Sequence, residues 1–289
     1  MNNYVIFADT GADISTQKLS EWGVMLCPLT FAFEGEERSY AGDEMPVKKF
    51  YDKMRAGGVA RTSAMNIETA KVMFTPELEK GNDVLYLAFS SGLSSTYSSA
   101  CIAAEELMED YPDRKVTVVD SLAASAGHGL LLWLAVKKKR EGASIEEVAK
   151  FCEGTRLNVC HWFTVDDLVY LKRGGRVSAT AALAGAVLGI KPVLHVDDEG
   201  HLINMLKVRG RKASIKALAD KYGELHRDGT DDGTVFISNG DCEEDAKALA
   251  ELLKERYGVK TGLITDIGPV IGAHSGPGTL ALFFIGEHR

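Results

Sequence analysis

The first half of the chain alternates short apolar runs with stretches of helical periodicity. Three runs are almost continuously apolar, at residues 4–9, 84–92 and 115–121. Strands that are apolar on both faces are typical of a parallel sheet covered by helices on both sides. Between and after these runs, apolar residues recur three and four positions apart. The helices predicted from this pattern lie at residues 46–58, 95–110 and 123–141.

From about residue 159 the pattern of apolar and polar residues changes. Residues 191–211 predict two strands around an Asp-Asp-Glu-Gly turn, and residues 180–190 predict a helix rich in alanine and glycine. This mixture is typical of an α+β domain. The other predicted elements are a strand that begins at 159, a short helix leading into 171–178, helices at 212–227 and 243–256, and strands at 233–238, 259–265 and 279–285.

The two patterns together predict an α/β protein of two domains. Residues 1–158 would form an N-terminal three-layer α/β/α domain with a mostly parallel sheet. Residues 159–289 would form a C-terminal α+β domain with a mixed sheet. Because no low-complexity linker separates the two halves, we expect an extensive interface between the domains.

Composition and charge exclude several classes of protein. The chain has 289 residues, of which 45% are apolar and 26% charged, as in ordinary globular proteins. The net charge of −8, from 33 basic and 41 acidic residues, argues against binding to nucleic acid. No apolar run reaches the roughly 18 residues of a membrane-spanning helix. The first residues also lack the pattern of a signal peptide.

The cysteines indicate the redox environment. An odd number of cysteines at irregular spacing, without a C-x-x-C pair, indicates reduced thiols rather than a disulfide framework or a zinc site. We therefore expect a cytoplasmic protein. The five cysteines are Cys27, Cys101, Cys152, Cys160 and Cys242.

Polar residues follow each of the three strands predicted in the first half. Asp9-Thr10, Ser90-Ser91 and Asp120-Ser121 stand where the apolar runs end. In open parallel sheets, ligands bind beyond the carboxyl ends of the strands. The pattern therefore indicates a ligand site at this edge, although capping of the following helices would explain Asp9 and Asp120 equally well.

The loop after the second of these strands is unusually rich in hydroxyl groups. Seven of the ten residues from Ser90 to Ser99 are serine or threonine, around a single glycine, Gly92. One helix start cannot use so many hydroxyl groups. Hydroxyl and backbone N–H groups near the start of a helix favour an anion, with Ser94 as the first candidate.

Three further motifs are candidates for ligand contacts. Thr62-Ser63, within RTSAM, is expected to begin a helix, and a plain N-cap is the alternative. The sequence LKRGGRVS at 171–178 places basic residues in a tight exposed turn. The sequence GPVIGAHSGPGT at 268–279 holds His274 in a stiff, glycine-rich turn, where the backbone can approach a ligand closely.

Basic residues concentrate in the second half of the chain. Between Lys172 and Lys212 there are eight basic and three acidic residues, in a protein that is acidic overall. This excess is either a solvated face or a docking surface for an acidic or phosphorylated partner.

The motifs of common enzyme classes are absent from the sequence. It has no P-loop, no complete dinucleotide fingerprint, no H-E-x-x-H and no metal-binding spacing of histidines, so we expect neither a cofactor nor a metal. GLSST at 92–96 lacks the final glycine of a nucleophile elbow. A serine hydrolase that uses Ser94, His274 and an aspartate stays open as an alternative.

Eight motifs, in this order, resemble those of the DegV family along essentially the whole chain. They are ADTGADI, TSAM, SSGLSSTYSSA, VVDS, LKRGGRVS, KPVL, KVRGRKA and PVIGAHSGPG. The resemblance implies two α/β domains with a long-chain fatty acid between them. It also implies a partner, because several members of the family serve as the fatty-acid-binding subunit of a two-component fatty acid kinase. In that system a separate ATP-binding subunit phosphorylates the bound carboxylate to an acyl phosphate.

The resemblance also implies roles for particular residues. The matching motifs indicate that the carboxylate is held by Thr62, Ser63, Ser94 and His274. They place Arg173, Arg209 and Arg211 near the docking kinase or the new phosphate. This chain differs from the family in having Ala64-Met65 where Gln-Pro is usual, and Ser95 where glycine is usual.

The chemistry of a fatty acid agrees with these roles. Burial of the tail contributes roughly 0.8 kcal/mol per CH₂ group, and we expect residues 182–190 to lie against it. The carboxylate needs hydrogen bonds in a dry pocket, and hydroxyl donors supply them without a strong ion pair. We therefore expect a non-catalytic subunit that presents the carboxylate to the kinase and touches the membrane surface transiently. The alternatives are the hydrolase of acyl esters and a lipid carrier or sensor without a kinase.

Overall fold

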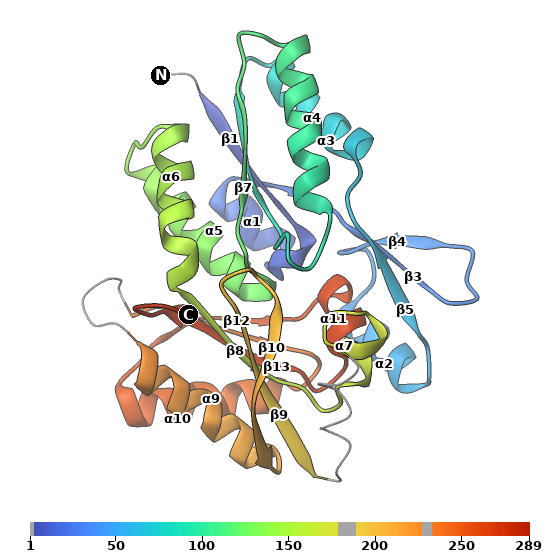
Figure 1. Ribbon diagram of the computed structural model, residues 1–289, viewed down its shortest axis with the longest axis vertical. Helices are drawn as coiled ribbons and strands as arrows, with labels where there is room; N and C mark the ends of the chain where they lie inside the picture. Colours follow the sequence, from blue (N-terminus) through green and yellow to red (C-terminus); the bar gives the residue numbers. More distant parts are fainter. Residues whose placement is uncertain (1–2, 179–188, 227–232) are drawn as a thin grey trace.

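A computed structural model describes residues 3–178, 189–226 and 233–289, and within these ranges the chain forms three β-sheets (Figure 1). The first, which we call the parallel sheet, has the strand order β2-β1-β6-β7, with every pair parallel. Its central strands are buried on both faces, as the continuous apolar runs predicted. The strands are β1 (Tyr4–Asp9), β2 (Val24–Cys27), β6 (Asp83–Ala88) and β7 (Val116–Asp120).

Helices cover both faces of the parallel sheet, which makes the three layers predicted from the sequence. One face packs on α3 (Ile67–Glu79) and α4 (Thr96–Asp110) through side chains such as Phe7 and Phe74. The helices on the other face are α1 (Thr16–Trp22), α5 (Ser125–Arg140) and α6 (Ile145–Thr155).

The second sheet, which we call the mixed sheet, has the strand order β10-β9-β8-β13-β11-β12. Its outer face packs on α9 (Arg211–Leu225) and α10 (Glu243–Tyr257). Its inner face packs on α5, so this helix lies between the two large sheets and shares one apolar core with both (Figure 1). The strands are β8 (Val159–Thr164), β9 (Ile190–Val196), β10 (Leu202–Arg209), β11 (Val235–Asn239), β12 (Thr261–Asp266) and β13 (Leu280–Ile285).

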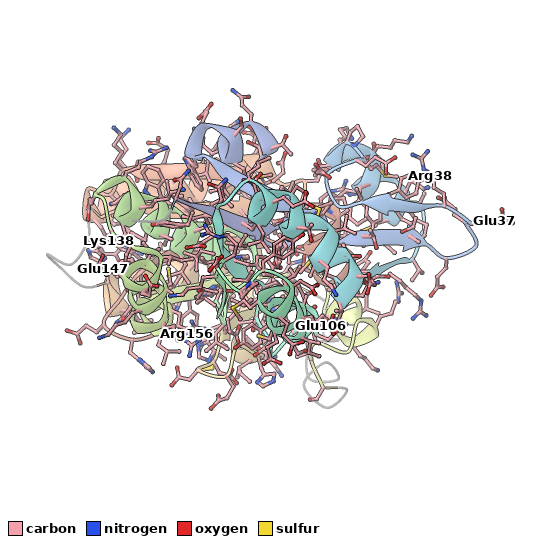
Figure 2. All side chains as sticks on the ribbon, turned by 90° about the horizontal axis from the view of Figure 1, so that it is seen from above. Glu37, Arg38, Glu106, Lys138, Glu147 and Arg156 are labelled. Atoms are coloured by element: carbon pink, nitrogen blue, oxygen red, sulfur yellow. The ribbon has the colours of Figure 1, made fainter. Side chains whose placement is uncertain are left out.

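A third, small antiparallel sheet was not predicted from the sequence. It consists of β3 (Thr30–Phe33), β4 (Ser39–Ala41) and β5 (Ala60–Ser63), covered by α2 (Val47–Arg55). Aromatic rings of Phe31, Phe33 and Phe50 form its core. Figure 2 shows the loop between β3 and β4, with Glu37 and Arg38 at its tip, extending away from the rest of the molecule.

The short helical elements lie around the junction of the three sheets. They are the 3₁₀ turns η1 (Thr10–Ala12) and η2 (Arg156–Asn158) and the helices α7 (Val169–Arg173) and α11 (Pro269–Ser275). The last of these helices corrects a prediction, because His274 lies in the final turn of α11 and not in a glycine-rich turn. The sequence G-P at the start of α11 suits a helix, since proline is favoured at the first helical position.

The second correction concerns Thr62 and Ser63, which end β5 and do not begin a helix. The helix that follows, α3, is capped instead by Asn66, whose side chain accepts a hydrogen bond from the Thr69 N–H at 2.8 Å. The predicted α/β fold class is confirmed. The division at residue 158 stays a prediction, and most of the helix predicted at 180–190 lies outside the described residues.

Gly127 allows α5 to pack closely on the mixed sheet. A Cβ atom at this position would lie 2.2 Å from Nε2 of His161 and 2.7 Å from Cδ1 of Phe283. Both neighbours are buried side chains on the inner face of the sheet. The helix can therefore approach β8 and β13 only because residue 127 has no side chain.

We expect Gly127→Ala to lower the free energy of unfolding by about 1–3 kcal/mol, because the methyl group overpacks this contact. Urea denaturation measures the change. Gly154→Ala in α6 is the matched control, since nothing lies within 4 Å of a Cβ atom at that position. The control should leave stability unchanged or raise it by up to about 1 kcal/mol. Equal effects at the two positions would contradict the close packing of α5.

Candidate functional site

A cavity lies between the inner face of the mixed sheet and the loops that follow the parallel strands. Its empty space, counted together with the open solvent at its mouth, measures about 960 Å³. Apolar side chains form most of its wall. Those of the floor are Phe163 of β8, Ala281 and Phe283 of β13, Val196 of β9 and Leu202 of β10; those opposite include Leu29, Phe89, Leu93, Ile267, Val270 and Ile271.

All four residues predicted to hold a carboxylate line this cavity. Thr62 and Ser63 reach it from the end of β5, Ser94 from the loop before α4, and His274 from α11. These elements are distant in the sequence, and the fold brings their polar groups to the same cavity. The Oγ1 atom of Thr62 lies 2.8 Å from Nε2 of His274 and joins two of them directly.

His274 is an uncharged hydrogen-bonding group. Burial, with a smaller contribution from the nearby Arg176 guanidinium, lowers the pKa of His274 to about 4. Its Nδ1 atom is buried beside Gly174 and has no hydrogen-bond partner within the described part of the chain. The imidazole is therefore neutral at physiological pH, and only Nε2 is paired, with Thr62.

The hydroxyl groups of the loop before α4 divide into two sets. Ser94 and Ser95 line the cavity, and Ser94 Oγ is paired with Thr96 Oγ1 at 2.9 Å. Ser90 Oγ instead donates to the carbonyl of Gly200 at 3.0 Å. The first set faces the ligand space, whereas Ser90 fastens the loop to the turn between β9 and β10.

Gly92 tightens the same contact between the loop and the hairpin. A Cβ atom on Gly92 would lie 2.6 Å from the carbonyl oxygen of Glu199. The glycine that interrupts the run of hydroxyl residues thus allows the loop before α4 to pack against the turn between β9 and β10. The hydroxyl residues of this loop therefore do two separate things: some line the cavity, and Ser90 holds the loop against that turn.

Arg176 and Ser275 also line the cavity, although neither was assigned to the site from the sequence. The Arg176 guanidinium donates to the carbonyl of Leu93, from Nη2 at 2.9 Å and from Nε at 3.3 Å, directly before Ser94. The Ser275 hydroxyl is buried and lacks a partner among the residues described. The LKRGGRVS motif was the signal for Arg176, but it could not show which of its cations reaches the cavity.

The three arginines predicted to dock a partner lie in different surroundings. Arg173 and Arg209 are exposed, at the ends of α7 and β10. Arg211 is mostly buried, and its Nε atom donates to Oδ2 of Asp245 at 2.8 Å. The docking role stays a prediction for all three, and the ion pair makes Arg211 the least available of them.

A buried carboxyl group, Asp13, joins the segments around the cavity. Its Oδ1 accepts a hydrogen bond from the Gly268 N–H at 2.8 Å, and its Oδ2 accepts one from Ser125 Oγ at 2.5 Å. Thr265 Oγ1 donates to its backbone carbonyl at 2.8 Å. Burial, which outweighs these hydrogen bonds, raises the pKa of Asp13 to about 8.

Ser94 and His274 are not joined by the hydrogen bond that a hydrolytic triad requires. Ser94 is paired with Thr96 instead, and the paired nitrogen of His274 contacts Thr62. The described ranges hold no group of three or more potential metal ligands. None of their helices is long and apolar enough to cross a bilayer.

An apolar cavity with a cluster of polar groups, built between two sheets, has the form of a small-molecule binding site. The chain belongs to the DegV family, because the model described as "Uncharacterised protein, DegV family" matches residues 3–287. The resemblance found in the sequence is thereby confirmed.

Relatives with known sequences or structures extend over the whole chain. A DegV domain-containing protein of Clostridium perfringens, CPE0026, is 43% identical and covers 100% of this chain and 99% of its own. A DegV lipid-binding protein of Thermotoga maritima has a TM-score of 0.85 at 32% identity, covering 99% of both chains. A DegV family protein of Thermus thermophilus, described by its fatty acid binding, has a TM-score of 0.86 at 29% identity, covering 99% and 100%. Family members are thus described as binding proteins, in agreement with the non-catalytic role expected from the sequence.

We expect the pH dependence of stability to change in Asp13→Asn. A folded-state pKa of about 8, above the ordinary value of 3.8, means that the folded chain keeps a proton that the unfolded chain releases. The stability from this group is fully present below about pH 4 and is lost as the pH rises toward 8. Asparagine cannot ionise, so the stability of the variant relative to wild type should increase over this interval.

Urea denaturation of both proteins between about pH 5 and pH 8 measures the difference. Asp113→Asn is the control, because Asp113 is exposed in the loop between α4 and β7. The control should show a constant difference from wild type. A constant difference in Asp13→Asn as well would show that Asp13 is charged in the folded protein.

Proposed function

We propose that this protein binds a long-chain fatty acid and presents its carboxylate to a separate kinase subunit. The observation that carries the proposal is the gathering of Thr62, Ser63, Ser94 and His274 on the wall of an otherwise largely apolar cavity. An acyl tail gains free energy from contact with the apolar wall. A carboxylate needs the hydrogen bonds that the polar cluster offers.

The polar cluster suits a carboxylate that must react later. Its hydroxyl groups can donate hydrogen bonds, and the neutral His274, which is paired with Thr62, adds no full charge beside the carboxylate. The Arg176 cation, near Ser94, is already engaged with two backbone carbonyls, of Leu93 and Gly174. A carboxylate held mainly by neutral donors keeps more of its nucleophilic character than one in a close ion pair with arginine.

The head group would lie near the surface. Ser63, Ala64 and Ser95 line the cavity and are exposed, so the polar wall opens to solvent on this side. A kinase subunit docked here could reach the carboxylate. One carboxylate oxygen would attack the γ-phosphorus of ATP held by that subunit, with ADP as the leaving group.

Binding without a kinase is the second candidate function. A lipid carrier or sensor would use the same cavity and head-group residues, and it would differ only in the absence of acyl phosphate formation. The exposed Arg173 and Arg209 favour the kinase, since exposed cations attract a partner that carries the negative charge of ATP.

Native mass spectrometry of the purified protein is the direct test of lipid binding. We expect a retained mass that equals a long-chain fatty acid and disappears after organic extraction. A ligand-free mass that no added fatty acid shifts would contradict the proposed function.

We expect Ser94→Ala to weaken the binding of a fatty acid by about 1–3 kcal/mol, because a buried acceptor loses its donor. The corresponding fatty alcohol should lose much less, since it has no carboxylate. Displacement of a fluorescent fatty acid measures both affinities. Ser98→Ala is the control, because Ser98 is exposed and bonds only to the carbonyl of Ser95. An equal loss for acid and alcohol would remove Ser94 from the head-group site.

We expect Arg209→Ala to slow acyl phosphate formation by on the order of tenfold without changing fatty acid affinity, because this exposed cation would guide the partner and does not line the cavity. The assay combines the protein, a fatty acid, ATP and the cognate kinase subunit. Lys150→Ala, an exposed cation on α6, is the control and should act like wild type. An unchanged rate in Arg209→Ala would exclude this residue from the docking surface, and no product with wild type would favour the carrier.

A further inference from the structure

Two successive glycines, Gly174 and Gly175, follow α7, and they are glycines for different reasons. Gly175 has a φ of +73°, a left-handed conformation that favours glycine, and nothing lies within 4 Å of a Cβ atom built on it. Gly174 has a φ of −72° and a ψ of −11°, a right-handed conformation that is open to any residue. The backbone therefore does not explain why position 174 lacks a side chain.

The contact of Gly174 with His274 supplies the reason. A Cβ atom on Gly174 would lie 2.2 Å from Nδ1 of His274, and 3.2 Å from both Cγ and Cε1 of the same ring. Its three nearest atoms thus all belong to one imidazole. The other nitrogen of that ring, Nε2, lies 2.8 Å from Oγ1 of Thr62. The imidazole is therefore held by Gly174 on one side and by Thr62 on the other.

Further contacts fix the turn that carries Gly174. A Cβ atom on Gly276, which follows α11, would lie 2.3 Å from Cδ2 of Tyr170, so α7 and α11 interlock at a second point (Figure 1). The carbonyl of Gly174 accepts a hydrogen bond from Nη1 of Arg176, and the same guanidinium donates to the carbonyl of Leu93 in the loop before α4. The turn is thereby tied both to α11 and to that loop.

We propose that Gly174 is a positioning residue of the head-group site, which holds the imidazole of His274 in the orientation that contacts Thr62 and faces the carboxylate. The proposal rests on the proposed function, because it takes the carboxylate of a fatty acid to bind beside these residues. It deepens that function by giving the LKRGGRVS turn a part in ligand binding that does not depend on its cations. A ring that is fixed in advance loses less conformational freedom on binding than one that the ligand must order.

The test compares stearic acid with stearyl alcohol in Gly174→Ala. The added methyl group would push the imidazole of His274 out of place, because rotation about side-chain torsions is easier than a shift of the interlocked turn. We expect the acid to bind about threefold to tenfold more weakly than to wild type, the loss of one hydrogen bond. The alcohol should bind almost as it does to wild type. Displacement of a fluorescent fatty acid measures both affinities.

Gly175→Ala is the matched control, because it strains the adjacent left-handed residue without adding an atom near His274. It should lower the midpoint of urea denaturation and preserve the ratio of acid to alcohol affinity.

A double-mutant cycle with His274→Ala separates positioning from a general structural effect. Without the imidazole, a methyl group at position 174 has no ring to displace, so Gly174→Ala should not weaken acid binding further in this background. A loss of equal size with and without the imidazole would overturn the proposal.

A second measurement needs no variant, and it decides the question even if Gly174→Ala does not fold. NMR cross-relaxation between Hε1 of His274 and the Hα protons of Gly174 should be present in the free wild-type protein and persist when stearic acid binds. Loss of this signal on binding would show that the ring leaves Gly174, and the positioning role would be wrong.

The outcomes separate this proposal from the proposed function. If wild type binds stearic acid and Gly174→Ala keeps the wild-type ratio of acid to alcohol affinity, the role of Gly174 is wrong and fatty acid binding stands. If the wild-type protein binds no fatty acid, both proposals fail.

Discussion

The buried carboxyl group of Asp13 is the contact on which the geometry of the cavity depends. It links η1, the first residue of α5, the residue before α11 and, through its backbone, the end of β12. α5 lies between the two large sheets, and α11 carries His274. The Asp13 side chain contacts the start of both helices and therefore sets the distance between α5 and the polar residues of the cavity wall. Such a carboxyl group is stable in a dry place only when it keeps its proton, as its raised pKa indicates.

A second constraint follows from the proposed function, because a bound carboxylate would have to be stabilised inside a cavity that is otherwise largely apolar. Neutral polar groups from three separate segments line this cavity, and Thr62 and His274 are hydrogen bonded to each other. Because His274 is uncharged, the site does not have to bury an unpaired cation when it is empty. Arg176 supplies positive charge nearby, but its hydrogen bonds to Leu93 fix it against the backbone. Electrostatic attraction and hydrogen bonding are therefore provided by different residues.

The sequence predicted the layers and strands well, because continuous apolar runs and helical periodicity follow directly from burial. It failed for the small sheet, whose strands of three and four residues carry too few positions for a pattern. Thr62 and Ser63 were named through the family resemblance, while their expected helix start was wrong, since a Thr-Ser pair suits a strand end as well as an N-cap. Arg176 could not be assigned to the site, and the contact of Gly174 with His274 could not be predicted. Which arginine of a turn faces inward, and which glycine of that turn packs on a histidine, are set by contacts between distant segments.

The loop before α4 combines two tasks in one segment: it lines the cavity, and it joins the parallel sheet to the mixed sheet. Ser90 and Gly92 hold the loop against the β9–β10 turn, at Gly200 and Glu199, while Ser94 and Ser95 face the cavity a few residues later. Because β9 and β10 also supply Val196 and Leu202 to the floor, the loop fixes the spacing between the hydroxyl groups of Ser94 and Ser95 and the apolar floor. A shift of the hairpin would therefore move the hydroxyl groups with it.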